Sequence, residues 1–259
     1  MKTPIKVTFL GTGTSQGIPV IASQHPVCLS TDPRDKRLRV SVLLSWDNFN
    51  YVIDCGPDFR QQMLRENVTH LDGILFTHEH SDHTAGIDDI RPFNFARGGN
   101  IPFYAHNRVF IALHQRFAYA FATENKYPGA PGIDEHPIEK DSVFTLGNKK
   151  VVVIEAYHDT LPVLGFRVED FTYLTDVKTI EEKEIEKVKG SKVLVINALR
   201  KKPHYSHFNL AEALAFVEKV KPERAYFTHI SHNMGFHAEV EKELPPNVYL
   251  AYDTLTITV

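Results

Sequence analysis

Short hydrophobic runs recur along the whole chain, separated by polar turns. Alternating or continuous apolar positions predict strands, and apolar positions three or four residues apart predict helices. The predicted strands cover residues 5–10, 40–46, 51–54, 73–77, 101–105, 151–157, 171–175, 193–196, 225–228 and 254–259. The predicted helices cover residues 58–66, 107–122, 179–189 and 209–220. No repeat, low-complexity tract or linker divides this series, so we expect one domain over residues 1–259.

Four of the predicted strands are followed at once by a residue that can bind a metal ion. These residues are His78, His158, Asp176 and His229. Strand ends that meet at one rim of a sheet hold functional side chains on a rigid scaffold. The pattern therefore predicts a metal site at such a rim.

The first of these residues opens the most concentrated polar motif in the chain. Residues 78–83 read His-Glu-His-Ser-Asp-His, which places three imidazoles and two carboxylates in six positions. These groups suit Zn²⁺, Mn²⁺ or Fe²⁺ in an open catalytic site. Histidines also gather by chance on solvated loops, but this spacing after a buried strand favours a metal. Asp54, at the end of another strand, would either brace this motif or cap its own loop.

The composition of the chain limits the cellular compartment and the partners that we expect for a protein with such a site. The chain has 259 residues and two cysteines, Cys28 and Cys55, which argues against a disulfide framework and fits a reducing compartment. No apolar run approaches the roughly 20 residues that cross a bilayer, so we expect a soluble cytoplasmic protein without a membrane partner. The net charge of −3 gives no general attraction to nucleic acid. The basic run 200–202 is more typical of a solvated face than of a binding site.

The glycine-rich segment 11–17 matches the beginnings of two familiar motifs. Residues 13–17 fit the G-x-S-x-G nucleophile elbow, and Gly11 and Gly13 begin a dinucleotide-binding fingerprint. Both motifs need a helix directly after the loop, whereas residues 18–21 look extended. We therefore interpret this segment as a tight backbone feature at the edge of the site.

Taken together, these motifs resemble the metallo-β-lactamase superfamily over nearly the whole chain. The resemblance implies an α+β fold, a four-layered αββα sandwich. It also implies that one divalent ion is held by His78, His80 and His158, that a second is held by Asp82, His83 and His229, and that Asp176 bridges them. The ions would be Zn²⁺ or Mn²⁺, with Fe or Ni as alternatives. True β-lactamases carry cysteine at the position of Asp176, and diiron oxygen reductases carry glutamate at that of His80, so neither activity is favoured.

Within the superfamily, the chain is most similar to the branch of the phosphoribosyl 1,2-cyclic phosphate phosphodiesterase and the tRNA 3′-processing endonuclease. The similar stretches are residues 11–17, 53–60, 88–93, 207–213 and 228–232. The resemblance implies that His207 acts near the scissile phosphate, with Asp82 and Asp176 as the other catalytic residues. The predicted reaction is hydrolysis of a small or cyclic phosphodiester or a nucleotide by a hydroxide that bridges the two ions.

The chain departs from this branch in one motif. Members of the branch often hold a structural zinc with a Cys-x-Cys-x-x-Cys run and a later histidine. Here Ser23, His25 and Cys28 stand in the run and His232 is the later histidine. Because a structural zinc needs four firm ligands, we expect this second site to be degenerate, completed by water, or lost, with loss favoured.

Three other functions stay open. A thioester hydrolase of the glyoxalase II type uses the same ligands but has a helical C-terminal region, whereas residues 254–259 are strand-like. A tRNA 3′-end endonuclease needs a basic arm, whereas the long insertion at residues 92–137 is aromatic. The third is a non-catalytic, metal-bound binding module. The aromatic insertion also suggests a homodimer contact.

Overall fold

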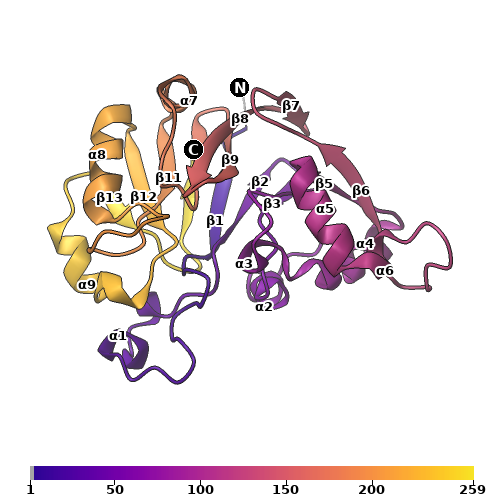
Figure 1. Ribbon diagram of the computed structural model, residues 1–259, viewed down its shortest axis with the longest axis horizontal. Coiled ribbons are helices and arrows are strands. Elements are labelled where there is room, and N and C mark those ends of the chain that lie inside the picture. Colours follow the sequence, from indigo (N-terminus) through magenta and orange to yellow (C-terminus); the bar gives the residue numbers. More distant parts are fainter. Residues whose placement is uncertain (1–2) are drawn as a thin grey trace.

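Two seven-stranded sheets lie face to face in the computed structural model, which describes residues 3–259. The first sheet has the order β14-β1-β2-β3-β4-β5-β6 and the second has the order β13-β12-β11-β10-β9-β8-β7 (Figure 1). The strands of the first sheet are β1 (Lys6–Gly11), β2 (Ser41–Trp46), β3 (Phe49–Ile53), β4 (Gly73–Leu75), β5 (Ile101–Ala105), β6 (Ile133–Pro137) and β14 (Thr256–Thr258). Those of the second are β7 (Val143–Leu146), β8 (Lys149–His158), β9 (Leu161–Val168), β10 (Phe171–Tyr173), β11 (Val193–Asn197), β12 (Arg224–Thr228) and β13 (Val248–Leu250).

Helices cover the outer face of each sheet, with α4 to α6 at one end of the molecule and α8 and α9 at the other (Figure 1). They are α1 (Pro26–Leu29), α2 (Phe59–Arg65), α3 (Ser81–Thr84), α4 (Arg91–Arg97), α5 (Asn107–Arg116), α6 (Ala118–Phe121), α7 (Glu182–Val188), α8 (Leu210–Val220) and α9 (His237–Val240). The longest, α8, starts at a capping box in which Asn209 and Glu212 bond each other's backbone N–H. Among residues 3–259, no helix is long and apolar enough to cross a membrane.

Side-chain alternation along the strands creates three hydrophobic layers. Val7 and Phe9 on β1 point between the sheets, where they join Val153 and Phe171 of the second sheet in the central core. Leu10, the neighbour of Phe9, packs instead in the outer cluster beneath α2, α4 and α5. A third cluster lies beneath α7 and α8. Because each sheet buries both faces, the layers are helix, sheet, sheet and helix, which confirms the predicted αββα sandwich.

The parallel parts of the two sheets explain why the site residues meet. Strands β3 to β6 run parallel in the first sheet, and β10 to β13 run parallel in the second. The carboxyl ends of parallel strands lie at one edge of a sheet, where ligands bind in open α/β sheets. The loops after β3, β4, β10 and β12 therefore open onto the same rim.

Several parts of the secondary structure differ from the prediction, and strands β6, β7 and β13 were not predicted. The helix expected over residues 107–122 is interrupted at Phe117, whose extended φ of −126° separates α5 from α6. Strand β9 was not predicted, because Pro162 and Gly165 interrupt its apolar run. Gly165 is required there by packing: a Cβ atom at this position would lie 2.1 Å from the side chain of Leu174.

Candidate metal centre

The histidine motif is fixed from below by one buried carboxylate. Asp54, directly after β3, accepts hydrogen bonds from the Thr77 backbone N–H at 2.9 Å and from Thr77 Oγ1 at 2.9 Å. The other contact of this carboxylate is His83 Nδ1, 2.7 Å from Asp54 Oδ2. Both Asp54 and His83 are fully buried. Of the two roles that the sequence left open for Asp54, these contacts fit bracing of the motif, which turns Nε2 of His83 toward the site.

Two glycines let the loops beneath the motif approach closely. A Cβ atom on Gly56 would lie 2.1 Å from the carbonyl oxygen of Asp82, and one on Gly86 would lie 2.1 Å from the carbonyl oxygen of Gly56. A larger side chain at either position would push the loop after β3 away from the motif. The absence of a side chain at these two positions therefore lets the loop that carries Asp82 and His83 pack close to the loop after β3.

The glycine-rich segment supports the opposite side of the site. The Thr14 N–H donates to the carbonyl oxygen of Ile230 at 3.1 Å, and the Ile230 N–H donates to that of Thr12 at 2.9 Å. Gly13 also pairs with Ile230 as an isolated bridge. The segment is thus a tight backbone feature next to His229, as the sequence indicated.

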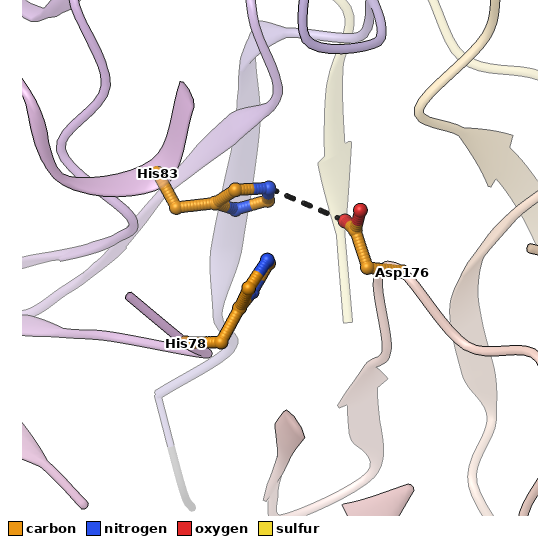
Figure 2. A group of neighbouring side chains, drawn as sticks. All are labelled: His78, His83 and Asp176. Atoms are coloured by element: carbon orange, nitrogen blue, oxygen red, sulfur yellow. Dashed lines mark ion pairs between the residues drawn. The ribbon is translucent and has the colours of Figure 1, made fainter. Parts of the chain in front are cut away.

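Asp176 lies at the centre of the site and faces side chains from both sheets. Its carboxylate oxygens lie 3.3 Å from Nε2 of His83 and 3.3 Å from Nε2 of His229. Figure 2 shows His78 and His83 pointing at Asp176 across the gap between the sheets. A third imidazole, that of His207, approaches with Nε2 at 2.9 Å from Asp176 Oδ1. A carboxylate in this position is suited to contact two ions at once.

Three overlapping groups of potential ligand atoms surround Asp176, the members of each lying within 4.8 Å of one another. They are Asp82 with His83 and His229, His78 with His83 and Asp176, and His158 with Asp176 and His207. The first is the ligand set expected for the second ion. His80 belongs to none of the three groups, but its Nδ1 lies 3.0 Å from Nε2 of His78 and its ring centroid lies 5.2 Å from that of His158. All seven predicted ligands thus gather at one rim, with the exposed His80 on its open side.

Three residues of the site hold an unfavourable backbone conformation at the end of a strand or within three residues of it. Asp54, Asp176 and His229 have φ values of 66°, 58° and 54°. For residues other than glycine this left-handed region costs on the order of 1–3 kcal/mol each, and it persists where the surrounding structure imposes it. Here the turn points each side chain back toward the rim.

Unsatisfied nitrogen atoms indicate what the centre is built to hold. Nε2 of His83 and both ring nitrogens of His229 are buried and have no hydrogen-bond partner. An unpaired buried polar atom costs roughly 1–3 kcal/mol, and divalent metals are bound by such imidazole nitrogens together with carboxylates. The residues present therefore fit a divalent ion.

The electrostatics of the centre agree with this fit. Burial alone would raise the pKa of Asp176, but the imidazoles of His229 and His83 hold it well below its usual range. Burial lowers the pKa of His78 well below that of a free histidine, so this imidazole is neutral. Burial alone would lower the pKa of His83, but the carboxylates of Asp82, Asp54 and Asp176 raise it well above that of a free histidine. Metal binding requires neutral imidazoles beside ionised carboxylates, so His83 would release a proton when a metal binds.

His207 is held by its own loop in reach of Asp176. The residue precedes the cap Asn209, so it stands before α8 rather than in its first turn. Burial lowers its pKa to about 4 against the pull of Asp176, which leaves the ring neutral. Its Nδ1 lies 3.0 Å from Oγ of Ser206, and the Ser206 carbonyl oxygen lies 2.8 Å from Nδ1 of His158. Ser206 therefore orients two histidines of the centre.

Thr77 and Ser206 orient side chains of the centre, but the sequence pattern does not mark either residue as part of the site. Thr77 counts in the pattern as the last residue of a strand, and Ser206 as part of a polar loop. Each stands directly before a predicted site histidine, His78 or His207. That adjacency is the one sequence signal that would have found them.

The second group of potential zinc ligands, whose site the sequence predicts to be degenerate, completed by water, or lost, looks different. His25 and His232 meet edge to face with ring centroids 4.9 Å apart. Nδ1 of His25 accepts the Val27 N–H at 3.3 Å, and Sγ of Cys28 accepts the Val20 N–H at 3.5 Å. Within residues 3–259, these three residues do not form a group of ligand atoms within 4.8 Å. The residues are neighbours, but they do not converge as the residues around Asp176 do.

Comparison with known proteins places this centre in a family. Residues 49–230 match the model of the Beta-lactamase superfamily domain, and this range includes strands of both sheets and all seven predicted ligands. The chain belongs to the metallo-β-lactamase superfamily. It is accordingly a hydrolase of the metallo-β-lactamase fold with His and Asp clusters that fit a divalent metal.

Similar proteins place the chain within that superfamily. The solved structure of a diphosphatase from the PhnP family is 36% identical, with a TM-score of 0.92, and the match covers 99% of this chain and 97% of that one. A ribonuclease Z from Methanococcus maripaludis is 31% identical over 85 residues, which are 32% of this chain and 22% of that protein. These matches support the predicted phosphodiesterase and tRNA-processing branch.

A third relative is named for a different chemistry. A Porphyromonas gingivalis protein named octanoyltransferase is 36% identical over 253 residues, which are 97% of this chain but 51% of that protein. The chain spans about half the length of this relative, and less of the ribonuclease Z.

Proposed function

We propose that the protein is a phosphodiesterase that uses two divalent ions, Zn²⁺ or Mn²⁺, to hydrolyse a small phosphodiester or a nucleotide. The observation that carries the proposal is the convergence on Asp176 of imidazoles from both sheets, with the neutral His207 at 2.9 Å from its carboxylate. The similarity to a diphosphatase of the PhnP family over almost the full chain supports a substrate that contains a phosphoryl group.

The ligand assignment follows the sequence prediction. His78, His80 and His158 would hold one ion, while Asp82, His83 and His229 would hold the other, with Asp176 between them. Two such ions lower the pKa of water toward 7 and neutralise charge on the phosphate oxygens. The remaining steps belong to the side chains of the chain itself.

Asp82 and Asp176 would orient the attacking water through the ionised oxygens that face the rim. His207 would donate a hydrogen bond from Nε2 to a phosphate oxygen as negative charge builds there. Alternatively, once a further proton has made its ring an imidazolium, it would protonate the leaving alkoxide. General-acid help of this kind contributes typically 10²- to 10⁴-fold. Ser206, at Nδ1 of His207, would fix the tautomer that carries the proton on Nε2.

The proposal is tested by metal analysis by mass spectrometry and turnover of bis(p-nitrophenyl) phosphate on the same purified sample. We expect about two metal ions per chain after Zn²⁺ or Mn²⁺ reconstitution, together with hydrolysis. Two ions without hydrolysis would reject the phosphodiesterase. Absence of metal after reconstitution would reject the centre itself.

A second candidate is hydrolysis of an acyl thioester, which the relative named octanoyltransferase favours. The region of similarity is about half of that protein, so its named activity can reside in the other half. Octanoyl and acetyl thioesters of a small thiol, offered to the same metal-loaded sample, separate the two candidates. Turnover of the thioester above that of the phosphodiester would replace the first proposal by the second.

A further inference from the structure

An exposed tyrosine lies on the loop that carries His207. Tyr205 lies between β11 and α8, and 75% of its surface is exposed. One face of its ring stacks on His204, with centroids 4.6 Å apart and an interplanar angle of 29°. The opposite face is left to solvent. A large aromatic ring that is exposed to this extent contributes little to packing.

A continuous series of rings connects this tyrosine to the candidate metal centre. The centroid of His204 lies 5.1 Å from that of His207, and the centroid of His207 lies 4.9 Å from that of His229. A single imidazole thus separates Tyr205 from the residue proposed to act on the phosphate. A substrate group resting on Tyr205 would belong to the molecule whose phosphate lies at His207.

The loop is fixed by hydrogen bonds, so Tyr205 is held in its exposed position. The Leu199 N–H donates to the carbonyl oxygen of Phe208 at 2.9 Å, and the Phe208 N–H donates to that of Val177 at 2.8 Å. The guanidinium of Arg200 bonds the carbonyl oxygens of Lys202 at 3.2 Å and Pro203 at 2.8 Å. A rigid aromatic surface binds a flat group with little loss of conformational entropy.

We propose that Tyr205 is a stacking platform for a nucleobase, so that the substrate is a small nucleoside phosphodiester rather than a base-free sugar phosphate. This inference rests on the proposed function. Aromatic side chains stack with any base through its π-face. A nucleotide carries its base and its 5′-phosphate at opposite ends of one ribose. A phosphate beside His207 therefore brings the base to the loop of Tyr205.

The first test compares two esters with the same leaving group on the metal-loaded protein. They are thymidine 5′-(p-nitrophenyl phosphate), which carries a base, and methyl p-nitrophenyl phosphate, which does not. We expect Tyr205→Ala to lower the ratio of their kcat/KM values about tenfold. Tyr205→Phe keeps the ring and should restore the ratio. An unchanged ratio in Tyr205→Ala would overturn the platform.

Tyr127 offers a matched control. It is also exposed, by 46%, and also stacks on a neighbouring ring, that of Tyr119 at 5.9 Å. Its loop, between α6 and β6, lies at the end of the molecule opposite α8 (Figure 1). Tyr127→Ala should leave the ratio unchanged. A fall as large as that in Tyr205→Ala would mean that tyrosine loss acts indirectly, which would overturn the platform.

A second measurement does not depend on turnover. Calorimetric titration with 5′-AMP and with ribose 5-phosphate should show tighter binding of 5′-AMP to the wild type, and the preference should disappear in Tyr205→Ala. If neither ester is hydrolysed but this preference is found, the platform stands and the proposed phosphodiesterase fails. If both esters are hydrolysed and no preference is found, the proposed function stands and the platform fails.

Discussion

The molecule contains two groups of potential zinc ligands, and they differ in whether the ligand atoms already have hydrogen-bond partners. In the centre around Asp176, His83 and His229 carry buried ring nitrogens without hydrogen-bond partners. In the smaller group, Nδ1 of His25 and Sγ of Cys28 already accept backbone N–H groups. Residue types alone would rank both groups as sites. The free lone pairs that point at a common space distinguish the first.

The two groups also differ in what holds them. The ligands of the main centre stand at or beyond the ends of strands, and three of the residues there are forced into left-handed turns. His25 and Cys28 belong to the single turn α1 and its cap. A rigid sheet edge keeps ligands in place before a metal arrives. A one-turn helix on a surface loop does not supply that rigidity.

The largest effect is expected at the residue that joins the two halves of the main centre. Asp176→Asn keeps the side-chain shape and the left-handed backbone but removes the charge that faces His83 and His229. We expect metal content to fall from about two ions to fewer than one per chain, measured by mass spectrometry after dialysis. Asp159→Asn is the matched control, because Asp159 is also left-handed but exposed. A fully loaded Asp176→Asn protein would contradict the bridging role.

Substitution of His207 distinguishes two roles for this residue, that of a metal ligand and that of a group acting on the substrate phosphate. Its Nε2 is near enough to Asp176 and His158 to be counted as a potential ligand. If it acts on the phosphate instead, His207→Ala will keep both metal ions and lose about 10²- to 10⁴-fold in turnover. Circular dichroism checks the fold. Loss of metal together with turnover would move His207 into the ligand set.

Asp54 tests how far the rigidity of the centre depends on a residue that does not reach the metal. Asp54→Asn keeps an acceptor for Thr77 but removes the negative charge at Nδ1 of His83. Loss of such a supporting partner typically lowers metal affinity 10- to 100-fold, which a competition titration with a chromogenic chelator measures. A matched exposed carboxylate, Asp134→Asn, should change nothing. Unchanged affinity in Asp54→Asn would mean that packing alone orients His83.

The residues that the sequence singled out for the main centre lie together in the structure because the signal that marks them is local. His78 and His229 come directly after buried strands, and the order of strands puts those ends at one rim. Part of the strand pattern was lost where another demand competed with it, as at Gly165 in β9, which packing against Leu174 requires.

What the sequence did not predict depends on contacts between distant segments. Thr77 and Ser206 orient site histidines through bonds to residues far along the chain. The smaller group has the residue types of a zinc site, yet Nδ1 of His25 caps the first turn of α1. That competition between a metal and a backbone N–H is a matter of geometry, which the spacing of residues does not encode.

The smallest effect on metal content is expected from substitutions in the smaller group of potential ligands. If the smaller group is lost as a zinc site, Cys28→Ala will leave the metal content at about two ions per chain. The substitution should cost on the order of 1 kcal/mol of unfolding free energy, since Cys28 is a buried packing residue. Chemical denaturation measures that cost.

Ser23→Cys supplies the missing ligand type at the position where Oγ now accepts the His25 N–H at 3.2 Å. We expect this variant also to hold about two ions, because Nδ1 of His25 and Sγ of Cys28 stay committed to the backbone. A third ion in Ser23→Cys alone would mean that the smaller group lacks only a ligand and not a geometry. A third ion in the wild type, lost in Cys28→Ala, would restore the site and remove the contrast between the two groups. The two groups would then differ only in their affinity for the metal. In the smaller group, Nδ1 of His232, which has no hydrogen-bond partner, would be the nitrogen that is free to bind the third ion.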